Sequence, residues 1–326
     1  RSFDDYKPAL YAYFAIPSVV IFGLNTFAVR FPSAFFGILT VLATFFLVKE
    51  IFPLKFTSGE SLRNTPEVAE WTPRGWIPLV AAFFLAISPW HIQFSRIAFE
   101  SNVGLAFNVF SVLFFLKGLK KPWFLILSAL LMGINIYIYQ SEKVFTPLIL
   151  LVLILIYRKD LFKIPKRFLI ASLLIGFIVS VPMISYTLIN KDALTRAKGV
   201  SVFSQTSQLL EENSKKLLGD KKNNDYLGLI LDNRRIVFAK TVIQGYLSHY
   251  DLNWLFVKGD IARHHAPNMG LLYLFEFPFL FIGIYSLIFG KFDKKTKLFI
   301  FSWFLIAPIP ASITSGVPHA VRTLNF

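Results

Sequence analysis

Residues 168–189 read Phe-Leu-Ile-Ala-Ser-Leu-Leu-Ile-Gly-Phe-Ile-Val-Ser-Val-Pro-Met-Ile-Ser-Tyr-Thr-Leu-Ile, without a single charged side chain. A bilayer core of about 30 Å requires about 20 mostly apolar helical residues to cross it, and this stretch is long enough. Seven further stretches reach or approach that length: 31–48, 75–95, 97–116, 122–141, 144–157, 271–290 and 298–315. The pattern predicts an all-α, polytopic membrane protein with about eight transmembrane helices.

The composition agrees with this interpretation. Of the 326 residues, 55% are hydrophobic and 16% are charged, whereas soluble proteins carry about 25% charged residues. Disorder requires low hydrophobicity and is excluded. The net charge of +15 raises the question of nucleic acid, but the basic residues stand between long apolar runs, so the expected partner is membrane lipid and not nucleic acid. The chain has no cysteine, which excludes disulfides and thiolate ligands.

The distribution of Lys and Arg in short connections predicts the orientation. The connections at 49–74, 117–121, 158–167 and 291–297 hold sixteen of these residues, whereas the opposite short connections hold Arg96 and Lys143. The first set is therefore expected in the cytoplasm. The segment 1–30, the turns at 95–100 and 141–143, the long loop 190–269 and the tail 316–326 are expected outside.

Two regions on the outer face are expected to form shorter helices. Residues 8–24 contain Pro8 and Pro17 among several Tyr, which favours a pair of interfacial helices over a span. Within the loop 190–269, residues 206–218 have a helix-forming composition and are expected to lie over the outer ends of the spans.

Unusual polar residues collect on the same outer face. Asp4, Asp5 and Lys7 stand directly before the aromatic stretch. A lysine there can bind a phosphate at headgroup level, or it can be an interfacial anchor beside Tyr. Arg96 and Glu100 surround the next outer turn. An acid at a membrane helix end is costly unless it is paired or functional, so Glu100 either pairs with Arg96 or takes part in catalysis.

Other polar groups are weaker candidates. Gln140, Glu142 and Lys143 are interpreted as a solvated outer turn. His264 and His265 are adjacent, so their side chains point in different directions and do not favour a metal site. His319 and Arg322 follow the last span as a phosphate-binding pair or a simple interfacial end. The sequence contains no nucleotide-binding loop or zinc-protease motif, and no metal or cofactor is expected.

Several of these stretches resemble one family. Asp-Tyr-Lys-Pro-Ala-Leu-Tyr (5–11), Phe-Gly-Leu-Asn (22–25) and Ala-Val-Arg-Phe-Pro-Ser-Ala-Phe-Phe-Gly (28–37) resemble the bacterial protein-mannosyltransferase and aminoarabinose-transferase superfamily. The run from Ser88 to Glu100 resembles the turn before the family's fourth span, and Pro-His-Ala-Val-Arg (318–322) is similar to a segment after a later span. These proteins are polytopic GT-C glycosyltransferases that use a polyprenyl-phosphate-linked sugar donor.

The resemblance implies an inverting, hexosyltransferase-like enzyme of the cell membrane. It would transfer a sugar from a polyprenyl-phosphate donor to a lipid, glycan or protein acceptor on the extracytoplasmic face. In the family a first-loop Asp takes the acceptor proton, and that Asp lies upstream of the Lys-Pro motif. The chain is therefore expected to be a fragment, incomplete at both ends and inactive by itself, in which Asp4 and Asp5 are the acidic candidates.

The family's other site residues carry over one by one. Lys7 matches the lysine of the Lys-Pro-Pro-Leu motif that contacts the donor phosphate, although Ala9 replaces the second proline. Glu100 matches the acidic position at the start of the fourth span. His319 and Arg322 fall where relatives place basic groups near the donor, and Arg96 is a further candidate to bind the phosphate.

Two other classes of function stay open. A polytopic transporter or lipid flippase would require charged or broken helices at mid-bilayer, and the ionisable residues of this chain cluster at the outer surface instead. A non-catalytic membrane scaffold would lack the family's Asp-Glu pair.

The predicted orientation can be tested with cysteines, because the chain contains none. Ser58→Cys and Ser204→Cys place one thiol in a connection expected inside and one in the loop expected outside. In intact cells an impermeant maleimide should label the second variant and not the first. Labelling of both variants from outside would contradict the orientation.

Overall fold

The computed structural model describes residues 9–53, 73–190, 199–203, 207–262 and 265–326. Helices account for 74% of the structure. Within the described ranges there is no strand, only an isolated antiparallel bridge between Ser201 and Thr314. The predicted all-α class is confirmed.

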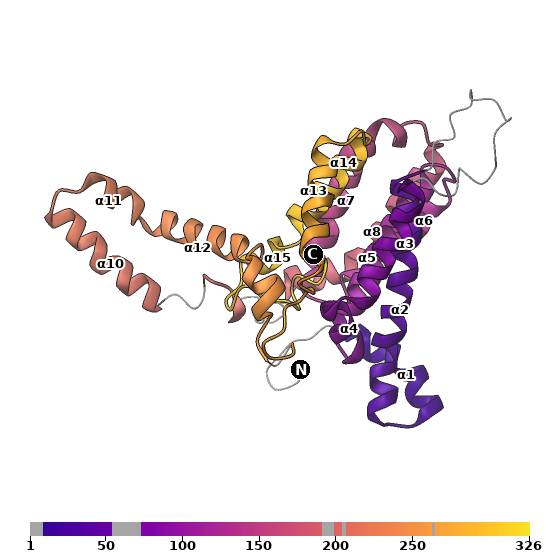
Figure 1. Cartoon of the computed structure of the whole chain (residues 1–326), viewed down its shortest axis with the longest axis horizontal. Helices are drawn as coiled ribbons and strands as arrows, with labels where there is room; N and C mark the ends of the chain where they lie inside the picture. The colour runs from indigo at the N-terminus through magenta and orange to yellow at the C-terminus, as the bar shows by residue number, and fades with distance from the viewer. Residues whose placement is uncertain (1–8, 54–72, 191–198, 204–206, 263–264) are drawn as a thin grey trace.

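The helices follow one another with short connections over most of the chain (Figure 1). The first part forms α1 (Leu10–Phe22), α2 (Thr26–Ile51), α3 (Pro73–Ile87), α4 (Pro89–Arg96), α5 (Glu100–Gly118), α6 (Phe124–Asn135), α7 (Glu142–Leu161) and α8 (Lys166–Ile189). The second part forms α10 (Ser207–Lys222), α11 (Tyr226–Leu231), α12 (Arg234–Ser248), the π-helical turn η2 (Trp254–Lys258), α13 (Glu276–Phe289), α14 (Lys294–Ile306) and α15 (Ile309–Ser312).

Fewer helices than expected are long and apolar enough to cross a membrane. In the described part of the chain α2, α5 and α8 meet this requirement, and α3 with α4 makes a fourth if the bent pair is one span. The prediction of about eight spans is therefore wrong by this measure. The predicted stretches 31–48, 97–116 and 168–189 correspond to the three long helices.

In the remaining predicted stretches the helices, or their apolar parts, are shorter than a membrane span. α6, α13 and α14 have 12, 14 and 13 residues, which at about 1.5 Å per residue is about 18–21 Å, less than the bilayer core of about 30 Å. α7 has 20 residues, but charged side chains at both ends confine its apolar part to 144–157. Long apolar runs in the sequence thus include turns that break the helices.

The bend between α3 and α4 has a local cause. The two helices meet at Ser88 at an angle of 56°. Pro89 occupies the first turn of α4, and the residue before a proline is disfavoured in helical conformation. Accordingly, Ser88 has a non-helical ψ of 124°. Its hydroxyl accepts a hydrogen bond from the His91 amide at 3.5 Å. The predicted span 75–95 is a broken helix.

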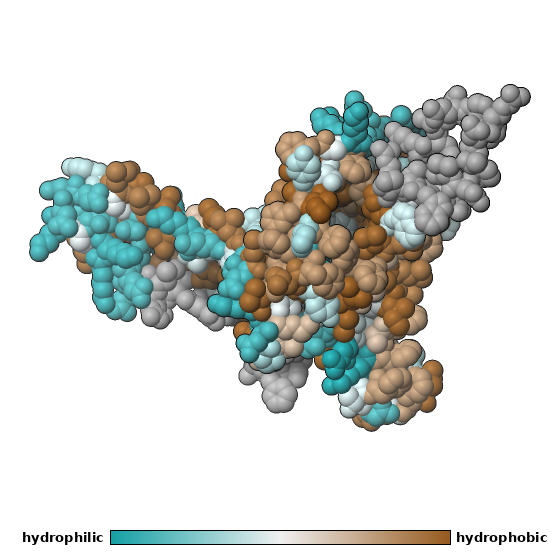
Figure 2. All heavy atoms as spheres, viewed as in Figure 1, coloured by the Kyte–Doolittle hydropathy of each residue, from teal (hydrophilic) through white to brown (hydrophobic). Residues whose placement is uncertain are grey.

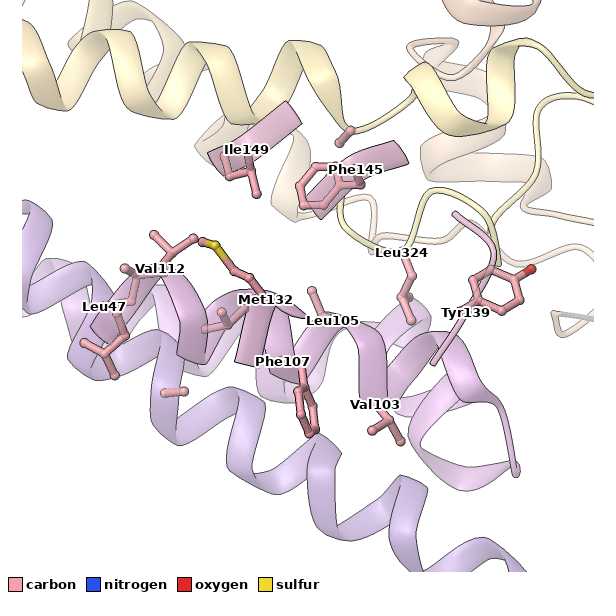
Figure 3. Packing of buried hydrophobic residues seen from close by; sticks show 14 of the residues in the cluster. Leu47, Val103, Leu105, Phe107, Val112, Met132, Tyr139, Phe145, Ile149 and Leu324 are labelled. Atoms are coloured by element: carbon pink, nitrogen blue, oxygen red, sulfur yellow. The ribbon is translucent and has the colours of Figure 1, made fainter. Parts of the chain in front are cut away.

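The bundle is built around α5. In a row, α3 packs on α2, α2 on α5, α5 on α6 and α6 on α8, while α7 packs on α14. Most of α5 is buried, whereas α8 has no buried residue. Figure 3 shows side chains from α2, α5, α6 and α7 meeting in the core, joined by Leu324 from the end of the chain.

The regions expected at the interface differ from the prediction in detail. Where a pair of helices was expected within 8–24, the described residues form one helix, α1 (Leu10–Phe22), that includes Pro17. It is joined to α2 by hydrogen bonds from Tyr11 and Ser18 to the Val29 and Ala28 carbonyls. The predicted helix at 206–218 is confirmed as α10. It does not cover the ends of the bundle, because α10, α11 and α12 extend sideways from it (Figure 1).

Candidate functional site

Three of the stretches that carry the family resemblance meet in space. Ser33 donates a hydrogen bond to the Phe94 carbonyl at 2.9 Å, and Asn102 donates to the Ser33 carbonyl at 2.8 Å. His91 Nε2 donates to the Gly37 carbonyl at 3.2 Å. Trp90 Nε1 donates to the Ala320 carbonyl at 3.2 Å. Segments far apart in the sequence, 28–37, 88–102 and 318–322, therefore lie together at one end of the bundle.

Arg96 and Glu100 lie on either side of a break between two helices. Arg96 is the last residue of α4 and is exposed, and Glu100 is the first residue of α5 and is half-buried. Ile97 and Phe99 between them are extended. No ion pair joins Arg96 to Glu100 in the described structure, so the paired interpretation is not supported. A carboxylate in the first turn of α5 is favoured by the helix dipole.

Arg322 supports the chain next to it. Its guanidinium donates to the Thr314 hydroxyl and, at 2.9 Å, to the Ser315 carbonyl. The backbone of residues 313–315 in turn binds residues 200–202, with Ser315 N donating to the Val200 carbonyl at 2.7 Å and Val202 N to the Ile313 carbonyl at 3.2 Å. Arg322 thus has a structural role in holding this turn.

His319 is held by another histidine. The backbone amide of His319 donates to Nε2 of the buried His249 at 3.3 Å, while Nδ1 of His249 lies 2.7 Å from the Gly245 carbonyl. Because a carbonyl only accepts, Nδ1 carries the proton and His249 is neutral. Burial lowers the pKa of His249, against smaller opposing effects from backbone hydrogen bonds and the charge of Asp260. Asp260 accepts from the Ala320 amide at 3.0 Å.

The structure therefore groups only part of the predicted site. His319 and Arg322 share the C-terminal segment, defined as residues 318–326, and Trp90 ties this segment to α4, which ends at Arg96. Asp4, Asp5 and Lys7 lie outside the described residues, so the structure neither supports nor contradicts their roles.

A buried polar cluster was missed by the sequence analysis. We call it the amide cluster, and its members are Asn108, Asn135, Ser141, Glu142, Thr146 and Asn325. Glu142 is 1% exposed, and its carboxylate accepts hydrogen bonds from Asn108 and, at 2.8 Å, from Asn325. Ser141 donates to it at 3.2 Å and Asn135 at 3.4 Å.

The interpretation of Glu142 as part of a solvated turn is therefore wrong. Gly104 allows the carboxylate to approach α5, because a Cβ there would lie 2.9 Å from Glu142 Cγ. The signal that could have identified the cluster is the pair Asn108 and Asn135, two amides inside otherwise apolar stretches. Polar side chains at such positions are expected to find partners in the bundle interior.

His265 has an ordinary structural explanation. It is 2% exposed, and its Nδ1 donates to the Ala266 carbonyl at 3.2 Å. Burial lowers its pKa. Among the described residues there is no group of three or more His, Cys, Asp or Glu that could hold a metal ion.

An open apolar groove lies between α6, α7 and α8. Its volume is about 790 Å³, within the range of about 300–1,000 Å³ typical of ligand sites. The lining is almost entirely hydrophobic and runs along α7 from Arg158 to Thr146. Since Thr146 belongs to the amide cluster, the groove ends beside that cluster.

Comparison with known proteins finds no relative of the chain. The chain matches no family model, no curated protein and no solved structure.

Replacing Asn325 should destabilise the protein. Asn325→Ala removes the 2.8 Å donor to the buried Glu142 side chain, and removing one partner of a buried hydrogen bond costs about 1–3 kcal/mol. The free energy of unfolding in detergent should fall by about that amount. Asn223→Ala, at an exposed position in the turn between α10 and α11, is the control and should change little. Equal stability of the two variants would show that the cluster does not hold the C-terminal segment.

Stability should also fall in mild acid because of His249. A histidine in the unfolded chain titrates near pH 6.5, whereas folded His249 resists protonation because burial lowers its pKa. Between the two pKa values the unfolded state binds more protons, so the free energy of unfolding decreases as the pH drops below about 6.5. His249→Asn should reduce this slope without abolishing it, since His265 acts in the same direction. The slope is measured by following unfolding from pH 7.5 to 5. An unchanged slope in His249→Asn would contradict the role of His249.

Proposed function

We propose that the chain is a GT-C-type, multi-pass module of the cell membrane that transfers a sugar from a polyprenyl-phosphate donor to an acceptor on the extracytoplasmic face. The observation that carries the proposal is the meeting of segments 28–37, 88–100 and 318–322 at one end of the bundle. These are the segments that resemble the glycosyltransferase superfamily, and a shared site would require them to be neighbours.

The chemistry of such a transfer requires cations and an acid at the reacting end. The acceptor oxygen attacks C1 of the sugar and gives its proton to a carboxylate, while the bond from C1 to the phosphate oxygen breaks and the lipid phosphate leaves with the electron pair. In this proposal Arg96, which is exposed, stabilises the leaving phosphate. Glu100 follows it across the helix break and can accept or orient a proton.

The donor's long hydrocarbon tail also requires an apolar surface. The groove between α6, α7 and α8 supplies one and is open at the side of the bundle. α8, which forms one wall, exposes large apolar side chains such as Leu173 at 72% and Phe177 at 68%. An exposed apolar surface of this kind is suited to lipid and not to water.

Filling the groove should block lipid binding. Leu150 lines the groove, and its neighbour Leu151 on the same helix is 51% exposed and does not line it. Leu150→Trp should lower photocrosslinking by a photoreactive polyprenyl phosphate in nanodiscs, whereas Leu151→Trp adds the same side chain outside the groove and should leave it unchanged. Equal labelling of both variants would show that the tail binds elsewhere.

A second experiment measures sugar transfer and the movement of the lipid between leaflets. Proteoliposomes that hold the complete protein, supplied with a polyprenyl-phosphate sugar and an acceptor, should form glycosylated product, whereas residues 1–326 alone are expected to form none. In the complete protein Glu100→Gln, which keeps the shape and removes the charge, should slow product formation. Movement of the lipid between leaflets without product would instead favour the lipid flippase. Binding of the donor with neither activity would favour the non-catalytic scaffold.

A further inference from the structure

The sideways extension of the molecule is a defined element. We call it the arm, residues 207–248, made of α10, α11 and α12. Asn213 of α10 donates a hydrogen bond to the Asp232 carbonyl at 2.7 Å. This bond joins the first helix of the arm to the turn between α11 and α12. Figure 1 shows the arm running away from the long helices and nearly across their direction.

The root of the arm is attached to the bundle at several points. Tyr246 of α12 donates to the Leu305 carbonyl at 2.7 Å, and Tyr250 just beyond it donates to the Phe304 carbonyl at 3.1 Å. Gly245 allows α12 to approach α15 closely, since a Cβ there would lie 3.0 Å from the Ser312 carbonyl oxygen. These contacts fix the direction in which the arm leaves the bundle.

The arm exposes large apolar side chains over α11 and α12. We call this set the apolar ridge, and its members are Tyr226, Leu227, Ile230, Leu231, Ile236, Ile243 and Leu247. Leu227 is 71% exposed and Ile243 is 56% exposed. On α12, positions 236, 243 and 247 are seven and four residues apart and therefore share one face. Figure 2 shows hydrophobic residues along the upper side of the arm and hydrophilic ones along its lower side, over α10.

The charged side chains of α12, beside the apolar ridge, are all basic. This helix carries Arg234, Arg235 and Lys240 and no acidic residue. Lys240 lies one turn from Ile236 and Ile243, and its Nζ donates to the Leu231 carbonyl at 3.0 Å. A helix with an apolar face and basic residues beside it is typical of segments that lie in the interface of an anionic bilayer.

We propose that the arm lies on the surface of an anionic lipid bilayer, with the apolar ridge in the boundary between headgroups and acyl chains. The bilayer is the one that the long helices of the bundle cross. The inference rests on the membrane location within the proposed function and does not require sugar transfer.

A bilayer fits the arm better than a second copy of the chain. The arm leaves the bundle sideways, across the direction of the long helices (Figure 1), as a segment lying in the plane of a membrane that those helices cross would do. Two copies joined through α12 would bring the same three cations together, and like charges in contact are unfavourable. Anionic headgroups attract these cations instead.

Spin labels can test the location, because the chain has no cysteine. Leu227→Cys and Ile243→Cys place a label on the ridge, at exposed positions whose change should not disturb folding. Lys215→Cys on α10 is the aqueous control, and Ile178→Cys, 65% exposed on α8, is the control for insertion. The protein is placed in nanodiscs of phosphatidylcholine and phosphatidylglycerol, and collision with oxygen is compared with collision with a water-soluble nickel complex.

The expected result is a several-fold excess of oxygen over nickel collisions at the two ridge positions and at Ile178→Cys, with the reverse at Lys215→Cys. Nickel-accessible ridge labels beside a lipid-embedded Ile178→Cys would overturn the inference while leaving the membrane location intact. Nickel access at Ile178→Cys would overturn both. Ridge labels shielded from both reagents and broadened by a neighbouring label would show that a second copy covers the ridge.

Discussion

The carboxylate of Glu142 lies where four separate parts of the chain meet, and the rest of the bundle depends on how it is satisfied. At 1% exposure it has no access to water, and a buried carboxylate without donors costs several kcal/mol. Asn108 comes from α5, Asn135 from α6 and Asn325 from the end of the chain. Each donor can reach the carboxylate only if its own segment is in place, so the cluster makes the packing of these segments interdependent.

The same requirement fixes the C-terminal segment, which then organises the candidate site. Once Asn325 is bound, Trp303 donates to its carbonyl at 2.7 Å and Trp90 reaches the Ala320 carbonyl. Asp260 and His249 hold the amides of Ala320 and His319. His319 and Arg322 are therefore part of one hydrogen-bonded network, whereas Arg96 at the end of α4 is exposed.

Two apolar surfaces of the molecule have different geometry and suit different parts of a membrane. The groove of about 790 Å³ is concave, runs along α7 and can enclose a single chain of hydrocarbon. The apolar ridge is convex, has basic residues beside it and can enclose nothing. A concave surface parallel to the long helices fits a lipid tail, and a convex one directed across them fits the plane of the bilayer surface.

Hydrophobicity along the sequence by itself determined that the protein is helical and where most of the helices lie, because helix formation depends on local composition. The same signal overestimated the number of spans, since an apolar run such as 122–141 does not reveal that its helix ends at Asn135. The resemblance indicated segments 28–37, 88–100 and 318–322, but the contacts of Ser33, Trp90 and Asn102 that bring them together depend on tertiary packing. Burial of Glu142 was likewise decided only by the fold. In the sequence it is a charged residue in a short turn, and the amide of Asn325 that binds it lies 183 residues away along the chain.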